Sequence, residues 1–222
     1  MSLLLRAIVA AEDAGVAADL ALSGVSGTRA AALASAWDTT RAAGEAELLD
    51  HHRIVQAVFE RVPCLPARFG SVFADEDALR ARLALREVDL ATQLVRLGHR
   101  CELAITCAWR DSEVVPRATI VPAPSGRVYL ERGLKKQRGE RERERRAEAI
   151  VARLLAELAI EPAFIRHRIC PRPAVAVSMS ALVTRDEISE LSSRVERIGA
   201  ELPDVTTVMQ GPWAPYTFAV SE

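Results

Sequence analysis

Cysteine and histidine are the residue types in this chain that could by themselves do chemistry. Cys64 lies between two prolines, and the adjacent pair His51 and His52 precedes it in a helix-like segment. A cysteine becomes an effective nucleophile when an imidazole lies within hydrogen-bonding reach. One interpretation is therefore a small cytosolic cysteine/histidine hydrolase or transferase that uses Cys64 with His52 or His51.

The spacing of the histidines argues against a preformed site. Adjacent side chains on a helix point about 100° apart, so His51 and His52 cannot serve one site as an i, i+4 pair would. His52 falls on the same helical face as several apolar residues, where we expect an imidazole to pack and bond a backbone group. Those apolar residues are Leu48, Val55 and Phe59.

The cysteines do not indicate a metal site. Cys64, Cys101, Cys107 and Cys170 contain no CxxC pair, whereas metal sites need clustered ligands at short spacings. Cys101 and Cys107 have an even spacing in a strand-like run, so both should face one side as buried thiols. GxSxG, P-loop and GxGxxG patterns are absent. We therefore expect no metal ligand and no catalytic residue.

A charged stretch from Lys135 to Arg146 is the other candidate site. It holds seven positive and three negative residues. An RNA-binding module would interleave aromatic side chains for stacking, and this stretch has none. We expect a solvated helix or a protein-docking surface, with no nucleic-acid partner; an RNA-associated module remains a third interpretation.

Composition indicates a soluble globular protein. The chain has 222 residues, half of them hydrophobic, and a net charge of −1, which suits one large domain or two small ones. Arg6 interrupts the first apolar run, and Glu12 and Asp13 follow where a signal peptide would carry small residues. No apolar run approaches the roughly 20 residues needed to cross a bilayer. We expect a cytoplasmic protein without a membrane partner.

Hydrophobic periodicity predicts an α+β protein. In the first half we expect strands at residues 3–10, 30–37 and 101–109 and helices at 45–59 and 75–97. Residues 66–73 are predicted to form a strand that packs Phe69 and Phe73 inside and points Arg68 outward. Asp75 should cap the next helix, and Gly98 should end it.

The helix at residues 75–97 has apolar residues on two sides. One stripe comprises Leu79, Leu83, Leu90, Leu94 and Leu97. Leu85 and Val88 lie roughly opposite, so this helix is either sandwiched between two elements or offers one side to another protein.

A proline-rich linker at residues 113–124 is expected to divide the chain. It separates an N-terminal, modified ferredoxin-like domain at 1–112 from a smaller α+β domain at 125–222 that begins with a long charged helix. The second domain should contain strands near 163–168, 174–183, 205–209 and 216–220. Thr184 and Glu187 predict a capping box for a helix between the second and third of these strands.

Four segments in order carry a resemblance to a known family. They are HHRIVQAVFE (51–60), PARFGSVFAD (66–75), SGRVYLERG (125–133) and GPWAPYTFAV (211–220). Together they resemble the gas-vesicle protein L/F family across nearly the whole chain. The matching residues singled out are Arg68, Phe69, Gly70, Gly126, Tyr129, Leu130, Gly211, Pro212, Trp213, Pro215 and Tyr216.

The resemblance implies a non-catalytic accessory or minor structural protein of gas vesicles, without a cofactor. Members are understood to assist assembly of the wall, so the implied partners are the shell protein and other accessory proteins. A shell subunit with a large apolar surface aggregates unless another protein covers it. The candidate partner contacts are Leu85, Val88, Trp213, Tyr216 and Phe218.

Overall fold

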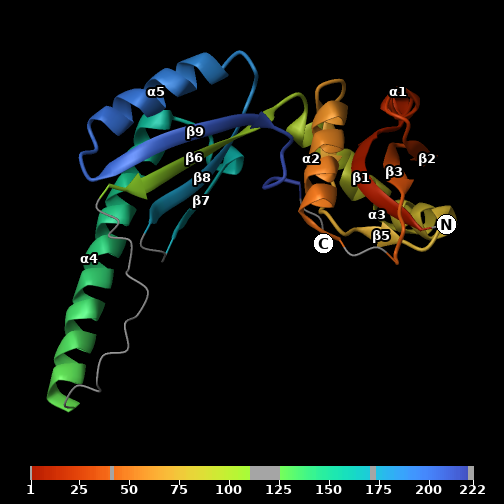
Figure 1. Ribbon diagram of the computed structural model, residues 1–222. Coiled ribbons are helices and arrows are strands. Elements are labelled where there is room, and N and C mark those ends of the chain that lie inside the picture. The colour runs from red at the N-terminus through yellow and green to blue at the C-terminus, as the bar shows by residue number, and fades with distance from the viewer. Residues whose placement is uncertain (1, 41–42, 111–125, 171–173, 220–222) are drawn as a thin grey trace. The chain divides into compact units, whose positions relative to one another are not determined.

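The computed structural model describes residues 2–40, 43–110, 126–170 and 174–219 (Figure 1). Side chains of residues 126–132, 135 and 136 are outside this description. The predicted linker at residues 113–124 also lies outside the described residues, so the domain boundary stays a prediction. Both helices and sheets are present, which confirms the mixed α and β content.

The chain forms two compact units, each built from segments that are distant in sequence. The first unit comprises Met1–Glu102, Leu182–Arg185 and Gly211–Glu222. The second unit comprises Leu103–Ala181 and Asp186–Gln210. The C-terminal segment thus belongs to the same unit as the N-terminus.

An antiparallel sheet forms the centre of the first unit. Its strands follow the order β2-β3-β1-β4, with β5 pairing with β1 (Figure 1). β1 and β3 pair from Leu3 with Ala36 to Ala10 with Ala30, with a register shift between Leu5 and Ala7. The strands are β1 (Leu3–Ala10), β2 (Ser23–Ser26), β3 (Ala30–Ala36), β4 (Cys64–Pro66) and β5 (Val72–Phe73).

Two helices cover this sheet. Arg6 of β1 reaches Asp50 of α2, whereas Leu5 and Ile8 line a cavity together with Leu79 of α3, so the two helices lie against different faces. The short helical segments η1 (Ala11–Asp13) and α1 (Val16–Asp19) connect β1 to β2. The two covering helices are α2 (Glu45–Phe59) and α3 (Glu76–Leu97).

The helix α2 has the predicted bounds but a different buried face. His51 is only 2% exposed, together with buried Val55 and Phe59, while His52 and Leu48 are exposed. The prediction that His52 and Leu48 face the core is wrong. Val58 is buried as well, so the buried face is rotated by about one residue from the predicted one.

Residues 66–73 do not form one strand. β4 ends at Pro66, and Gly70 adopts φ +91° in a turn in which the Ser71 amide donates to the carbonyl of Arg68. This left-handed conformation favours glycine and ends the extended run. Phe69 and Phe73 are consequently half-buried rather than internal, and Arg68 is exposed.

The helix α3 begins and ends as predicted. The Asp75 carboxylate accepts a hydrogen bond from the amide of Ala78 at 2.8 Å, and Gly98 lies at the C-cap with φ +52°. The stripe of Leu79, Leu83, Leu94 and Leu97 is buried, with Leu90 half-buried. Leu85 and Val88 are exposed, so within the described residues this helix is not sandwiched.

The second unit is built on a four-stranded sheet of order β7-β8-β6-β9. Its elements follow the order β-α-β-β-α-β, which is that of a split βαβ arrangement. The first unit, for which a modified ferredoxin-like fold was predicted, runs β1-α1-β2-β3-α2-β4 before β5 and α3. This order agrees with a split βαβ arrangement, and the ferredoxin-like description of the first unit stays a prediction. The elements are β6 (Cys101–Trp109), α4 (Gly126–Leu158), β7 (Ile165–Ile169), β8 (Val175–Val183), α5 (Ile188–Ala200) and β9 (Val205–Trp213), with η2 (Pro162–Phe164) before β7.

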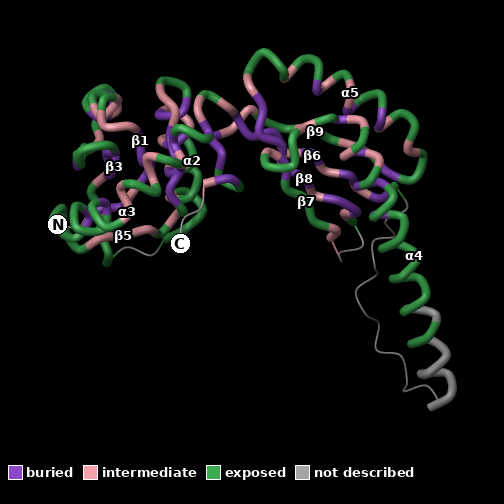
Figure 2. Tube along the Cα trace, turned by 180° about the vertical axis from the view of Figure 1, so that it is seen from behind, coloured by how far each residue is buried: buried purple, intermediate pink, exposed green. Residues whose placement is uncertain are grey.

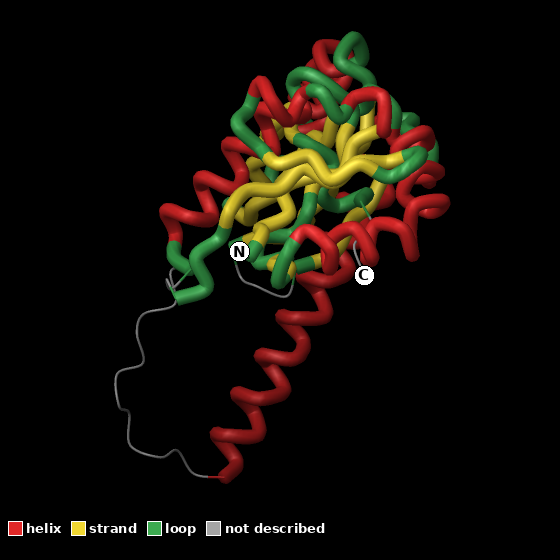
Figure 3. Tube along the Cα trace, turned by 90° about the vertical axis from the view of Figure 1, so that its right-hand side faces the viewer, coloured by secondary structure: helices red, strands yellow, loops and turns green. Residues whose placement is uncertain are grey.

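Among the described side chains of α4, those that pack against the second unit begin at Ala147. Ala147, Ile150, Val151, Leu154 and Leu158 are buried, whereas residues 137–146 are exposed (Figure 2). The helix has 33 residues, and Figure 3 shows its first half extending past the sheet of the second unit. The charged stretch thus forms a solvated helix, as expected.

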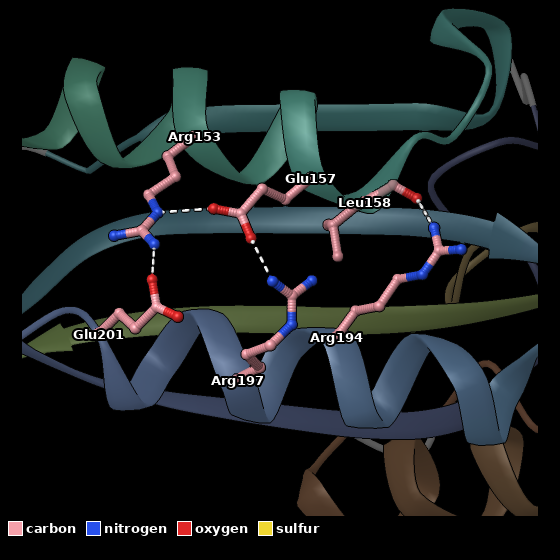
Figure 4. A network of polar contacts seen from close by, with 6 residues as sticks. All are labelled: Arg153, Glu157, Leu158, Arg194, Arg197 and Glu201. Atoms are coloured by element: carbon pink, nitrogen blue, oxygen red, sulfur yellow. Dashed lines mark hydrogen bonds and ion pairs between the residues drawn. The ribbon is translucent and has the colours of Figure 1, made fainter.

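Arginine and glutamate side chains join α4 to α5 (Figure 4). Glu157 accepts a hydrogen bond from Arg153 at 2.7 Å and forms an ion pair with Arg197 at 3.2 Å, and Arg153 also bonds Glu201. Arg194 donates to the carbonyl of Leu158, the last residue of α4, at 2.9 Å. A cation at this position satisfies a free carbonyl and opposes the negative end of the helix dipole.

Two predictions about the second half fail locally. The helix α5 starts at Ile188 with Glu187 as its N-cap and without a side-chain cap bond, so the predicted start at Thr184 is wrong. Residues 216–219 form a turn rather than a strand, because Pro215 ends the extended backbone and the amides of Phe218 and Ala219 both bond its carbonyl.

Candidate interaction site

Three of the four family-like segments meet in the first unit. One runs along α2, the second spans β4, the Gly70 turn and β5, and the third is the C-terminal segment after Gly211. The fourth, around Gly126, Tyr129 and Leu130, lies at the start of α4 in the second unit, where side chains are not described. The candidate site is therefore built from the first three.

His51 ties α2 to the segment after β4. Its Nε2 lies 2.9 Å from the carbonyl oxygen of Ala67, and because a carbonyl only accepts, Nε2 carries the proton and donates. Burial lowers the pKa of His51, so the imidazole is neutral near pH 7. The expected packed histidine with a backbone partner is therefore present, but it is His51 and not His52.

Phe69 forms the wall of the site next to His51. Its ring meets the His51 ring edge-on at 5.5 Å between centroids and the Trp37 ring at 6.1 Å. Edge-to-face contacts of this kind add to the burial of apolar area. Because Trp37 follows β3, the ring of Phe69 is clamped between two distant segments.

A surface cavity of about 420 Å³ opens beside these rings. His52 stacks on Tyr216 at its edge, with 6.3 Å between ring centroids and 30° between planes. The wall is mainly apolar, and its polar groups belong to Arg68, Tyr216 and the two histidines. The lining residues are Leu48, His51, His52, Pro66, Arg68, Phe69 and Tyr216, and we call this the motif cavity.

The C-terminal segment is held against the first unit by Gln56 of α2. The Gln56 amide nitrogen donates to the carbonyl of Pro212 at 3.3 Å, and its oxygen accepts from the amide of Ala214 at 3.4 Å. Trp213 between them is half-buried, and Pro215 is buried. This pairing brings Tyr216 to the motif cavity.

Further along the segment, a buried carboxylate holds the turn. Glu102 of β6 accepts from the amide of Thr217 at 2.8 Å and from the hydroxyl of Thr217. Arg96 of α3 donates to the carbonyl of Phe218 at 3.3 Å. Phe218 is buried, so it is not available as the partner contact that the sequence suggested.

The geometry does not activate Cys64. The thiol is buried, and burial raises its pKa to about 12, so it is protonated near pH 7. The Nε2 of the neutral His51 donates its hydrogen bond to the carbonyl of Ala67, and the exposed His52 stacks on Tyr216. Among the described residues, no group of three His, Cys, Asp or Glu side chains could hold a metal ion.

Comparison with known proteins adds an independent observation. The family model described as "Gas vesicle synthesis protein GvpL/GvpF" matches residues 6–220, which is nearly the whole chain. The chain belongs to this family. The resemblance inferred from the four segments is thereby confirmed.

Individual members of the GvpL/GvpF family agree with this assignment. Gas vesicle protein L from a Streptomyces species is 32% identical over 181 residues, covering 76% of this chain and 67% of that protein. The crystal structure of GvpF from an Anabaena species aligns with a TM-score of 0.77 at 18% identity, covering 100% of this chain and 97% of that one. GvpF from Microcystis aeruginosa aligns with a TM-score of 0.72 at 16% identity, covering 99% of both chains. These two structures share the fold.

Several residues of the site were not found from the sequence. Gln56 and Trp37 carry no local signal, because their partners come from distant segments. Glu102 did have one: it is the single charged residue in the strand-like run 101–109, and a carboxylate inside a buried strand needs a partner. No helix in the described part of the chain combines the length and apolarity needed to cross a membrane.

Proposed function

We propose that this protein is a non-catalytic accessory or minor structural protein of gas vesicles. It assists assembly of the wall by binding the shell protein and other accessory proteins, at the vesicle or in the cytoplasm. The observation that carries the proposal is the convergence of three family-like segments on the motif cavity. Such convergence is expected of a binding surface, and the burial that keeps Cys64 protonated does not support the alternative of a hydrolase or transferase that acts through Cys64.

The lining of the motif cavity suits one side chain of a polypeptide partner. Leu48, Pro66 and Phe69 provide an apolar wall for an aliphatic or aromatic anchor. Arg68 is exposed at the rim and can take a carboxylate or a chain carbonyl in its planar fork. Trp213 and Tyr216 remain candidate partner contacts in this proposal, since both retain exposed area.

Two neighbouring leucines of α2 provide a matched test. Leu48 lines the motif cavity and is 48% exposed, whereas Leu49 is 60% exposed and does not line it. Leu48→Glu should reduce capture of the purified shell protein in a pull-down by about tenfold or more, because a carboxylate then occupies the apolar wall. Leu49→Glu makes the same chemical change nearby and should leave capture unchanged.

The same variants should be expressed in a strain that lacks the gene. Deletion should abolish or deform gas vesicles in electron micrographs, and the wild-type chain and Leu49→Glu should restore them. Leu48→Glu should not. Normal vesicles in the deletion strain would contradict the assembly role, and equal shell capture by both variants would contradict the motif cavity as the binding site.

A further inference from the structure

One face of α3 carries the most exposed large hydrophobic side chains among the described residues. Val95 is 83% exposed, Leu85 is 80% exposed and Val88 is 62% exposed. Scattered apolar residues are normal on protein surfaces, but these three lie on one side of a single helix, and we call them a patch. This patch is distinct from the motif cavity and is not needed for the proposed function.

The spacing of this face is that of a coiled-coil seam. Apolar or small residues recur at intervals of three, four, three, four and three, which is the heptad pattern of a and d positions. All of them are exposed. The residues are Ala78, Ala81, Leu85, Val88, Thr92 and Val95, and we call them the α3 seam.

We propose that a second copy of this chain packs antiparallel along the α3 seam. In this pairing each Leu85 lies in one layer with Val88 of the other copy. The small residues Ala78 and Ala81 then face Val95 and Thr92 of the other copy, so each layer combines a smaller side chain with a larger one. A two-fold axis relates the copies, as in most homodimers.

The charges beside the seam select this register. Arg82 and Asp89 each follow a d position and are exposed. In the antiparallel pairing, such flanking residues meet their counterparts, so Arg82 of each copy lies beside Asp89 of the other. Sliding one helix by a heptad would instead place Arg82 beside Arg96 and the two copies of Asp89 beside each other.

The other flank also permits close approach. Ala84 and Ala91 precede the a positions Leu85 and Thr92, and in the same register they face each other across the dimer. Small side chains here let the helices approach without displacing the seam. A parallel pairing would set Ala78 and Ala81 against themselves, which leaves one end poorly filled, and would align the helix dipoles unfavourably.

The length of the seam sets the expected strength. It extends for about five helical turns, or roughly 26 Å. A single helix pair of this length buries less area than a standard stable interface. The dimer should therefore be reversible and depend on protein concentration.

Sedimentation velocity of the full chain over a series of micromolar concentrations tests the proposal. The dimer fraction should rise with concentration, and Leu85→Lys should raise the dissociation constant about tenfold or more. Leu49→Lys, on α2, is the matched control and should leave it unchanged. A wild-type chain that stays monomeric throughout, or a dimer indifferent to Leu85→Lys, would overturn the proposal.

A charge exchange tests the orientation. Arg82→Glu or Asp89→Arg alone places like charges side by side and should weaken the dimer about fivefold to tenfold. The double variant exchanges the charges and should restore the wild-type dissociation constant. Failure of the double variant to restore association would exclude the antiparallel register.

Shell protein is the competing occupant of the seam. If Leu85→Lys abolishes shell capture while the wild-type chain remains monomeric, the seam belongs to that partner and not to a second copy. If Leu85→Lys removes dimers but leaves shell capture through the motif cavity intact, self-association and the proposed function are separate properties.

Discussion

At the scale of single residues, Glu102 shows how a buried carboxylate fixes the C-terminal segment. Both of its oxygens accept hydrogen bonds from Thr217, one from the amide and one from the hydroxyl. Burying an ionised carboxylate is unfavourable unless such partners replace water, and charge-assisted bonds are the stronger kind. The position of Tyr216 next to the motif cavity therefore depends partly on a strand residue that does not line it.

The first prediction concerns the substitution Glu102→Ala. The amide and hydroxyl of Thr217 would lose their acceptors, and we expect a loss of about 1–3 kcal/mol in the free energy of unfolding. The C-terminal segment should also become more sensitive to carboxypeptidase. Urea unfolding and timed proteolysis measure both effects. Glu102→Gln keeps an oxygen acceptor and should lose less; an unchanged unfolding midpoint for Glu102→Ala would contradict the assigned role.

At the scale of elements, ionic contacts join α4 to α5 in addition to the packing of their apolar faces. Glu157 forms ion pairs with Arg153 of its own helix and with Arg197 of α5 (Figure 4). The hydrogen bond from Arg153 lowers the pKa of Glu157 below its usual range. Because the folded-state pKa is lower than the unfolded one, the contribution to stability is complete above the unfolded value and disappears as pH falls through the folded value.

The second prediction follows from this sign. Glu157→Gln should destabilise the protein near pH 7, and the difference from wild type should shrink as the pH falls below the unfolded-state pKa of glutamate, about 4.3, toward the lower folded-state pKa of Glu157. Urea unfolding at a series of pH values measures it. Glu148→Gln, at an exposed position of α4, is the control and should show a smaller difference. A difference for Glu157→Gln that does not change with pH would mean that packing, not charge, explains it.

At the scale of the whole molecule, the four cysteines differ in solvent exposure. Cys64 is buried in the first unit, Cys101 and Cys107 are buried in β6, and Cys170 is half-buried. Burial raises the pKa of Cys107 as well as that of Cys64, which lowers the fraction of reactive thiolate further.

The third prediction is that thiol reagents distinguish Cys170 from the other cysteines. In the native protein at neutral pH, Cys170 should react first, and the remaining three should react only after unfolding. Mass spectrometry of alkylated peptides with and without urea measures this order. Rapid native labelling of Cys64 would contradict its inert state and revive the hydrolase interpretation.

The sequence predicted those elements whose signals are local. α2 and α3 have the predicted bounds to within a residue, since the Asp75 cap, Gly98 and the leucine stripe all act within a few residues of one another. β1, β3 and β6 likewise follow from runs of mostly apolar residues. The prediction of a strand at 216–220 is wrong for residues 216–219, because the chain turns after Pro215.

The sequence by itself determined the family, the mixed α and β content and the second apolar side of α3, because motifs and periodicity are read along the chain. Only the tertiary structure decided which histidine is buried and that Gln56 and Glu102 hold the C-terminal segment. These outcomes depend on contacts between segments far apart in sequence. In α2, two helical faces that differ by a rotation of one residue are almost equally apolar in sequence. Which of them is buried therefore depends on the elements that pack against the helix.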